Sequence, residues 1–331
     1  MRVANYVPFL AAHGVELDFV STLTSEEYAL TISAASAVKK AAVLVRAAAR
    51  ARSLVHDDRL LLLHRLLLLT PCPGIDPPRH VDAYDLDDAL FVGSAAQNNR
   101  RFQWTKQEGR RALACMGKAR LVTVSTSFLA DHARQHAAHV EVLPSCVDPE
   151  VQPLHDHHAG DHLVIGWIGS HTTAPYLEPV LPLIAGLHER DARIRLVVVG
   201  GDTGLRNDWI EHRPWSEATQ AADLASFDVG IMPLPDSDWT RGKAGYKLLQ
   251  YFSAGVPAVA SPVGVNAELV ADGRGFTADG DSEWVRALTD LLRDPHERHE
   301  RGQAARRFVK EHYSYQRWAP ELAALLRSLA V

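Results

Sequence analysis

The chain has 331 residues, of which 47% are hydrophobic and 23% are charged. This composition excludes a predominantly disordered chain, because so large an apolar fraction can bury an extensive core. Lysine and arginine number 35 against 40 aspartate and glutamate residues, so the net charge is −5 and generic nucleic-acid binding is disfavoured. At about 150 residues per domain, the length predicts two domains.

The cysteines and the apolar segments predict a soluble, cytoplasmic protein. Cys72, Cys115 and Cys146 are far apart and form no Cys-x-x-Cys pair, which favours a reducing compartment and predicts no thiolate zinc site. The most apolar stretch covers only residues 60–69, whereas a bilayer crossing needs about 20 residues. Residues 1–6 lead into no long apolar region of the kind found in export signals.

Hydrophobic periodicity in the first half predicts an α/β domain over residues 1–150. The basic stretch in this half is expected to form a helix with Lys39, Arg46 and Arg50 on one side. The expected elements, in chain order, are a helix over 3–13, a strand over 15–20, a basic helix within 28–56, strands over 60–63 and 80–85, a helix over 103–118, a strand over 121–124, a helix from 127 and a strand over 140–143.

A polar and irregular stretch predicts a linker over residues 151–161. Four histidines lie in or beside it, and they are His155, His157, His158 and His162. They suggest metal binding, but an exposed polar connection is the preferred interpretation, because a compositional hint alone is weak.

The second half alternates apolar strands with helical patterns. Strands that are apolar throughout indicate a parallel sheet covered by helices on both faces, which is a doubly wound domain over residues 162–314. A helix over residues 315–331 follows and could pack back on the N-terminal domain. The expected strands are 163–168, 194–199, 229–232 and 258–260.

Residues 166–173 form the first of three segments suited to ligand binding. A strand there ends in Gly169 and Ser170, and small residues let backbone N–H groups approach a phosphate near a helix N-terminus. The signal is weak alone, because any tight turn between a strand and a helix favours glycine and serine.

A second segment, residues 239–251, concentrates positive charge. If a helix starts at Gly242, Lys243 and Lys247 share one face, and Arg241 adds a third charge near the helix N-terminus. This arrangement suits a diphosphate, and the alternative is a solvated helix face. Because like charges at this end of a helix cost stability, we favour the functional interpretation.

A third segment covers residues 261–268 and includes Gly264 and Glu268. The glycine permits close backbone approach, and the glutamate either accepts hydrogen bonds from a sugar hydroxyl or caps a helix.

Together the three segments carry a resemblance. From residue 121 to residue 328 the chain resembles the group 1 glycosyltransferases, family GT4, of GT-B fold. The matching stretches are 122–130, 143–148, 245–264 with Glu268, 272–276 and 313–315. The resemblance implies an α/β fold of two doubly wound Rossmann-like domains facing a cleft. It further implies a nucleoside-diphosphate sugar held by the C-terminal domain, an acceptor on the N-terminal domain and transfer with retention.

One departure concerns the family's pair of glutamates, which would fall on Gly242 and Gln250 here. Gln250 can still contact the donor ribose as a neutral hydrogen-bonding group. The family also tends to carry a basic residue after the first C-terminal strand, and Lys243 and Lys247 are expected to supply that charge. The predicted donor-binding residues are Gly169, Ser170, Arg241, Lys243, Lys247, Gln250, Gly264, Val265, Asn266 and Glu268.

In the N-terminal half, an acidic cluster stands where many family members place a histidine. Asp85 and Asp87 are the candidate catalytic residues. The Asp-x-Asp spacing is also typical of metal sites in GT-A enzymes, but a GT-B enzyme stabilises its leaving diphosphate with lysines and helix ends. An equally weighted alternative is structural, with Asp88 capping a helix from Ala89.

The predicted function is therefore metal-independent, retaining transfer from a nucleoside-diphosphate sugar to a glycan, a lipid or a small molecule, without a cofactor. The alternatives are a noncatalytic GT-B-like binding protein and a nucleotide-sugar epimerase. The basic segment 31–52, beside residues 60–69, could also dock on anionic lipid, and the alternative is an amphipathic helix of the N-terminal domain.

The start of the chain differs from the expected domain. A doubly wound domain normally opens with a strand near the middle of its sheet, followed by a glycine-rich turn. Here the helix over residues 3–13 comes first, so we expect an N-terminally truncated version of the working protein. The alternative is a rearranged sheet in which residues 15–20 take the edge.

Overall fold

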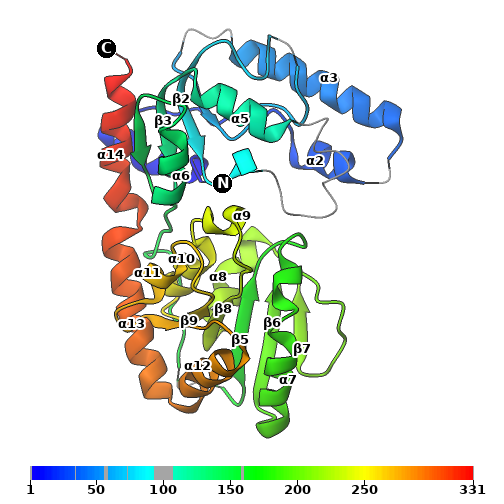
Figure 1. Cartoon of the computed structure of the whole chain (residues 1–331), viewed down its shortest axis with the longest axis vertical. Helices are drawn as coiled ribbons and strands as arrows, with labels where there is room; N and C mark the ends of the chain where they lie inside the picture. The colour runs from blue at the N-terminus through cyan, green and yellow to red at the C-terminus, as the bar shows by residue number, and fades with distance from the viewer. Residues whose placement is uncertain are drawn as a thin grey trace. The chain divides into compact units, whose positions relative to one another are not determined.

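The computed structural model describes residues 2–33, 35–55, 59–72, 74–92, 107–157 and 160–330. The chain divides into two compact units, which we call unit 1 (residues 1–144 and 319–331) and unit 2 (residues 145–318). Each contains a parallel β-sheet with helices packed on it (Figure 1). The predicted α/β class is confirmed.

Unit 1 contains a four-stranded sheet in the order β1-β2-β3-β4. All neighbouring strands run parallel. The strands are β1 (Leu62–His64), β2 (Val81–Leu86), β3 (Ala119–Val124) and β4 (Val140–Val142). Every residue of β2 is buried. The four strands expected between residues 60 and 143 are present, with small shifts at their ends.

The strand expected over residues 15–20 is absent, and this prediction was wrong. The alternating pattern is present, but Phe19 and Val20 are exposed and Val15 and Leu17 are only half-buried, so the segment lacks the buried face of a core strand. Among the described residues, β1 pairs with β2 alone, so residues 15–20 do not take the edge either. Residues 16–22 instead line a cavity of about 860 Å³ together with residues 59–64.

Helices surround the sheet of unit 1. The helix expected over residues 3–13 forms as three short pieces and ends at Gly14, whose φ of 70° is left-handed. The basic helix is preceded by a separate helix that starts with a capping box between Thr24 and Glu27. Residues 103–106 of a further expected helix lie outside the described residues. The helices are η1 (Ala4–Tyr6), α1 (Val7–Leu10), η2 (Ala11–His13), α2 (Ser25–Ile32), α3 (Ala37–Leu54), η3 (Leu90–Val92), α5 (Glu108–Met116) and α6 (Ser127–Ala133).

Unit 2 contains a six-stranded sheet in the order β10-β9-β8-β5-β6-β7. Its strands, all parallel to their neighbours, are β5 (Leu163–Ile168), β6 (Ile194–Val199), β7 (Ile210–Arg213), β8 (Val229–Met232), β9 (Ala258–Ala260) and β10 (Gly275–Thr277). After β7 the chain returns past β5 to form β8. The direction of winding therefore reverses between the central strands β5 and β8.

Helices cover both faces of the unit 2 sheet, as a doubly wound fold requires. They are η5 (Ala174–Leu177), α7 (Leu181–Arg190), α8 (Glu217–Ala225), α9 (Asp238–Arg241), α10 (Tyr246–Ser253), α11 (Asn266–Val270), α12 (Asp281–Arg293) and α13 (Pro295–His312), and α14 (Tyr315–Ser328) follows. One buried core gathers around Trp167 and Trp284, and a second gathers around Phe227 and Tyr251. From Ala319 onward, α14 belongs to unit 1.

The segment expected as an exposed linker is part of unit 2, and for two of its histidines that interpretation was wrong. His157 is buried, and His155 has only 8% of its side chain exposed. Both rings hydrogen-bond to backbone carbonyls of unit 2, which explains why they leave the solvent. Burial lowers the pKa of His157 to about 4, so its ring is neutral at neutral pH.

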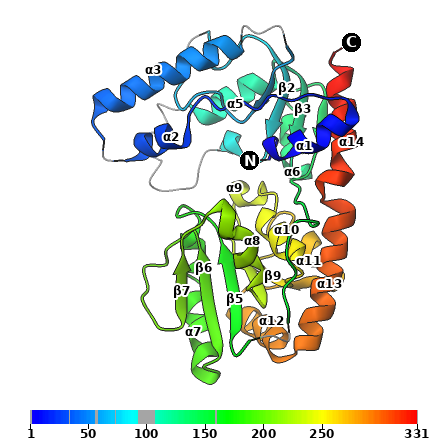
Figure 2. The same ribbon diagram turned by 180° about the vertical axis from the view of Figure 1, so that it is seen from behind.

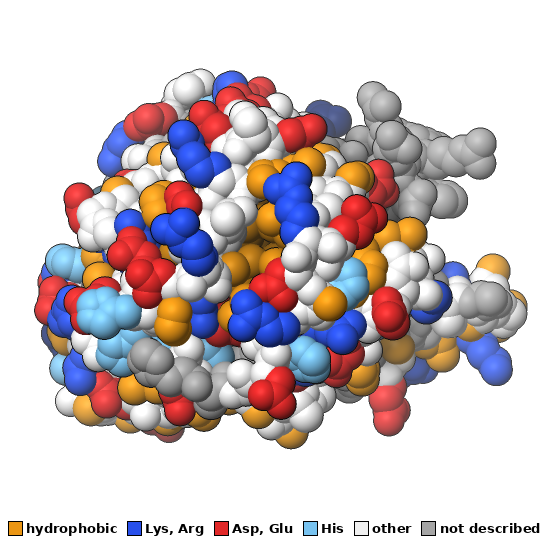
Figure 3. Space-filling model, turned by 90° about the horizontal axis from the view of Figure 1, so that it is seen from below, with side chains coloured by type: hydrophobic (Ala, Val, Ile, Leu, Met, Phe, Trp, Pro, Cys, Tyr) orange, Lys and Arg blue, Asp and Glu red, His pale blue; other side chains and the backbone are white. Residues whose placement is uncertain are grey.

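The described helices include none that is long and apolar enough to cross a membrane. On the face shown in Figure 3, basic and acidic side chains are interspersed, which agrees with the small net charge of −5.

Candidate functional site

The carboxyl ends of β5 and β8 mark the point in unit 2 where the winding direction reverses. In open α/β sheets, ligands bind beside the carboxyl ends of strands at such a point. Gly169 and Ser170 follow β5 directly. Helices α9, α10 and α11 lie close together in both ribbon views (Figures 1 and 2), and they carry most of the other predicted donor-binding residues.

Lys247, in the first turn of α10, reaches the loop after β5. Its Nζ lies 5.3 Å from the centroid of the Trp167 ring. A Cβ atom added at Gly169 would lie 2.9 Å from Cε of Lys247 and 2.5 Å from the same ring. The absence of a side chain at Gly169 therefore lets the lysine lie against the carboxyl end of β5.

Lys243 does not share a helix face with Lys247, and this prediction was wrong. No continuous helix runs from Gly242, because α9 ends at Arg241 and α10 begins at Tyr246. The break occurs at Gly245, which caps α10 with a left-handed φ of 64°. Lys243 lies between the helices, with Nζ 5.3 Å from the Trp239 ring centroid.

Two glycines hold the loop after β9 against α9 and α10. A Cβ atom at Gly264 would lie 2.6 Å from the backbone oxygen of Arg241. A Cβ atom at Gly245 would lie 3.3 Å from Val265 and 3.6 Å from Asn266. The structure therefore brings four predicted residues into one cluster, and they are Arg241, Gly264, Val265 and Asn266.

The charge of Arg241 is already paired. Its Nε and one terminal nitrogen donate to the two carboxylate oxygens of Asp236 at 2.7 and 2.8 Å. The same hydrogen bonds lower the pKa of Asp236 below its usual range. Arg241 therefore brings its own counter-charge to this cluster.

The remaining predicted donor residues lie nearby in sequence but differ in exposure. Gln250 is buried one turn after Lys247 on the same helix, so these two side chains share a face. The Ser170 hydroxyl is 2.7 Å from that of Thr172. Glu268 is exposed on α11. Burial of Tyr313 raises the pKa of its hydroxyl, the charge of Glu268 raises it further, and the pKa reaches about 12.

Asn266 has one unsatisfied atom. Its Nδ2 donates to the Ser261 carbonyl at 3.2 Å, whereas its buried Oδ1 has no hydrogen-bond partner among the described residues. An unpaired buried amide oxygen beside a predicted ligand site is a ready acceptor for a ligand donor group.

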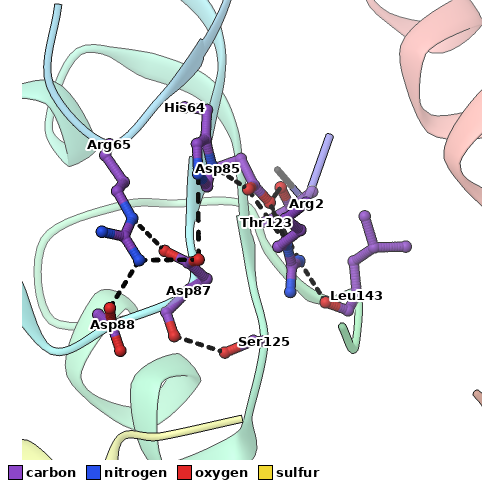
Figure 4. Close-up of polar contacts among 9 residues, drawn as sticks. All are labelled: Arg2, His64, Arg65, Asp85, Asp87, Asp88, Thr123, Ser125 and Leu143. Carbon is purple, nitrogen blue, oxygen red and sulfur yellow. Dashed lines mark hydrogen bonds and ion pairs between the residues drawn. The ribbon is translucent and has the colours of Figure 1, made fainter. Parts of the chain in front are cut away.

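In unit 1, Asp85 is the centre of a buried polar cluster (Figure 4). Its carboxylate accepts from Nε of Arg2 at 3.1 Å and from the Thr123 hydroxyl at 2.6 Å, and the exposed fraction of its side chain is 1%. Burial alone would raise the pKa of Asp85, but the charge of Arg2 and the hydrogen bond from His64 outweigh it and lower the pKa to about 2. Asp85 is therefore ionised and fully partnered.

Asp87 and Asp88 are held by a single arginine (Figure 4). Arg65 donates to both oxygens of Asp87, at 2.6 and 3.0 Å, and to Asp88 at 2.6 Å. Arg65 has a left-handed φ of 59°, which is costly for a residue with a side chain. Although burial opposes ionisation, this arginine lowers the pKa of Asp87.

His64 is a polar residue that the sequence interpretation missed. It ends β1, and its Nδ1 lies 2.7 Å from the carboxylate of Asp85, with Nε2 4.0 Å from Asp87. A carboxylate that accepts from one ring nitrogen fixes the tautomer and leaves the other nitrogen as a base. The available signal was the polar pair His64-Arg65 interrupting an apolar run.

The comparisons with known proteins agree with this geometry. Residues 162–294 match the family model described as glycosyl transferases group 1. No curated protein sequence matches the chain. The structure is similar to WaaG, a glycosyltransferase involved in lipopolysaccharide biosynthesis, with a TM-score of 0.66, 15% identity and coverage of 97% of this chain and 93% of that one.

Two further solved structures share the fold. The sucrose-phosphate synthase of Thermosynechococcus elongatus matches with a TM-score of 0.61 and 16% identity over 75% of this chain and 67% of that one. Anabaena HepE, solved in complex with UDP-glucose, matches with a TM-score of 0.57 and 15% identity over 74% of this chain and 71% of that one.

These findings define the class of protein. The fold is GT-B, with two parallel-sheet units, as the sequence predicted. The chain carries a group 1 glycosyltransferase domain over residues 162–294 and is an enzyme of the glycosyltransferase class.

Proposed function

We propose that this chain is a retaining glycosyltransferase that takes a sugar from a nucleoside-diphosphate donor without a catalytic metal. The observation that carries the proposal is the position of Lys247 against Gly169, at the switch point of a group 1 glycosyltransferase domain. An ammonium group placed there neutralises charge on the diphosphate as the bond to the sugar breaks. A relative of the same fold that was solved with UDP-glucose supports a nucleotide-sugar donor.

The other donor contacts are assigned from the same cluster. The first turn of α10 adds the positive end of its helix dipole to the charge of Lys247. Gln250, one turn further along, hydrogen-bonds the donor ribose in place of the family's glutamate. Gly264 lets the loop after β9 pack closely against Arg241, and Asn266 offers its unpaired Oδ1.

On the acceptor side, we assign Asp85 a positioning role for His64. The 2.7 Å contact between them keeps the ring in one tautomer, with Nε2 as a base for an acceptor hydroxyl. We assign Asp87 the catalytic role that the sequence predicted for it, with its charge balanced by Arg65. The acceptor class, whether glycan, lipid or small molecule, is set by residues around this cluster.

Purified protein incubated with a panel of nucleotide sugars tests the proposal. We expect one donor to raise the melting temperature and to release its nucleoside diphosphate when an acceptor is present, with the anomeric configuration retained by NMR. Donor binding without turnover would favour the noncatalytic alternative, which the replacement of the two family glutamates by Gly242 and Gln250 motivates. Release of an epimerised sugar would favour the epimerase.

We also propose peripheral contact of α3 with anionic membranes. Val38 and Val45, one heptad apart and so on one side of the helix, are 79% and 69% exposed, and Lys39 and Lys40 directly follow the first of them. The protein should therefore sediment with anionic vesicles and not with neutral ones, and high salt should release it. Replacing both valines by aspartate should abolish sedimentation, and an unchanged bound fraction would exclude this surface.

A further inference from the structure

Three side chains with metal-ligating atoms meet in unit 2, away from the predicted donor-binding residues around Lys247 and Gly264. Asp228 immediately precedes β8, and His155 and His157 come from the segment before β5. One potential ligand atom from each lies within 4.8 Å of the other two. The group therefore sits at the amino end of β8, whereas Lys247 lies beside the carboxyl end of β5.

Backbone hydrogen bonds fix the tautomers of both histidines. Nδ1 of His155 lies 2.8 Å from the carbonyl oxygen of Ala225, and Nε2 of His157 lies 2.9 Å from that of Gly255. A carbonyl oxygen can only accept, so each of these ring nitrogens carries its proton. In a neutral ring the other nitrogen then has a free lone pair, and metal-ligating histidines typically donate their second nitrogen in this way.

The two remaining nitrogens differ in their surroundings. Nε2 of His155 lies 3.3 Å from Oδ1 of Asp228, so it donates to this carboxylate from a protonated ring or, in a neutral ring, turns its lone pair toward it. Nδ1 of His157 is buried and has no hydrogen-bond partner among the described residues. A cation between the three side chains would satisfy all these acceptors at once.

The carboxylate has the support that a metal ligand requires. Oδ2 of Asp228 accepts from the backbone N–H of Val164 at 2.8 Å, and Oδ1 lies 3.2 Å from a terminal nitrogen of Arg298. Arg298 also donates to the carbonyls of Leu291 and Leu292, so its position is set by α12 and not by the carboxylate alone. Each carboxylate oxygen has two lone pairs, so Oδ1 can accept from the arginine and bind an ion.

We propose that His155, His157 and Asp228 bind one divalent transition metal of the zinc class. Two imidazole nitrogens and one carboxylate oxygen suit such an ion. Ligand atoms about 2.0–2.2 Å from a tetrahedral zinc lie about 3.3–3.6 Å from each other, and the contact of 3.3 Å between His155 and Asp228 falls in that range. The fourth position is open to water or to His299, whose ring centroid is 6.1 Å from that of His157.

The ion would have a structural role. It would fasten the segment before β5 to the start of β8, and its binding free energy would add to the stability of unit 2. The site shares no residue with the predicted donor-binding residues, so this proposal does not depend on the proposed glycosyl transfer.

The test uses the full chain without a polyhistidine tag, stripped of metal with a chelator and titrated with Co²⁺. We expect visible d–d absorption that saturates at one equivalent, displacement of Co²⁺ by Zn²⁺, and a higher melting temperature with either ion. His155→Ala and His157→Ala should each weaken binding at least about 10-fold. The matched control is His162→Ala, which removes an exposed histidine from the same stretch and should bind like the wild type.

Two results would overturn the proposal. One is the absence of saturable binding, in which case His155 and Asp228 form only an ion pair. The other is binding that survives both histidine substitutions or falls equally in the His162→Ala control. If a variant fails to fold, anomalous scattering from zinc-soaked wild-type crystals decides, since a peak between the three side chains supports the site and a peak elsewhere or none refutes it.

Discussion

Replacing Lys247 by alanine should weaken binding of the nucleoside-diphosphate donor by about 10- to 150-fold. This range corresponds to the loss of one hydrogen bond to a charged group, about 1.5–3 kcal/mol. The physical reason is position, because Lys247 lies in the first turn of α10 and against Gly169 at the end of β5. Isothermal titration with the donor identified in the panel measures the effect, and turnover should fall at least as much, because the diphosphate gains charge in the transition state.

A matched control is Lys310→Ala in the same unit. Lys310 pairs with Glu150 at 2.7 Å and 61% of its side chain is exposed, so its removal should leave donor affinity unchanged. Lys243→Ala should have a smaller effect than Lys247→Ala, because Lys243 lies between the helices and over Trp239. Wild-type donor affinity in the Lys247→Ala variant would show that this lysine does not bind the diphosphate.

Replacing Arg2 by alanine should destabilise unit 1 by about 3–5 kcal/mol, because it leaves the charge of Asp85 buried without its counter-ion. The side chains of Arg2 and Asp85 are 4% and 1% exposed, so water cannot take the place of the guanidinium. Hydrogen exchange of the amide groups in β2 and β3 measures the change in opening free energy for this unit separately from unit 2.

The control is Arg59→Ala, which also breaks an ion pair in unit 1. The side chains of Arg59 and its partner Asp18 are 65% and 63% exposed, so we expect a loss of less than about 1 kcal/mol. Equal losses of opening free energy in Arg2→Ala and Arg59→Ala would mean that burying the ion pair of Arg2 and Asp85 does not add to the stability of unit 1.

The contribution of Asp85 also has a defined pH dependence. Its pKa falls from an ordinary 3.8 to about 2 in the folded state, so the stabilisation is complete above about pH 4 and is lost as the pH falls toward 2. The difference in opening free energy between the wild type and Arg2→Ala should therefore narrow over that interval. A difference that stays constant from pH 7 to pH 3 would contradict this assignment.

Local pattern was sufficient for four of the six strands of unit 2, whereas β7 and β10 were not predicted. Strands such as β5 and β6 are apolar throughout because both faces of a parallel sheet are covered, and that signal is visible in sequence. The loops carrying Gly169 and Gly264 were also predictable, since a turn at the end of a strand demands small residues. The group 1 resemblance rested on the same stretches, and the family model matches residues 162–294.

Two errors arose because local pattern does not reveal what a segment packs against. Residues 15–20 alternate like a strand, yet Phe19 and Val20 stay exposed and no residue of this segment is fully buried. His155 and His157 stand in a polar stretch, yet backbone carbonyls of unit 2 bind their rings and bury them.

By itself, the sequence determined the α/β class, most of the parallel sheet of unit 2 and the stretch that carries the predicted donor-binding residues, because hydrophobic periodicity and glycine positions are local properties. Only the tertiary structure decided which charges act together. It separated Lys243 from Lys247 at Gly245, paired Arg241 with Asp236 and brought His64 to Asp85. Such contacts join residues distant in sequence or depend on a single backbone turn, and the free energy that selects them comes from the packing of the whole unit.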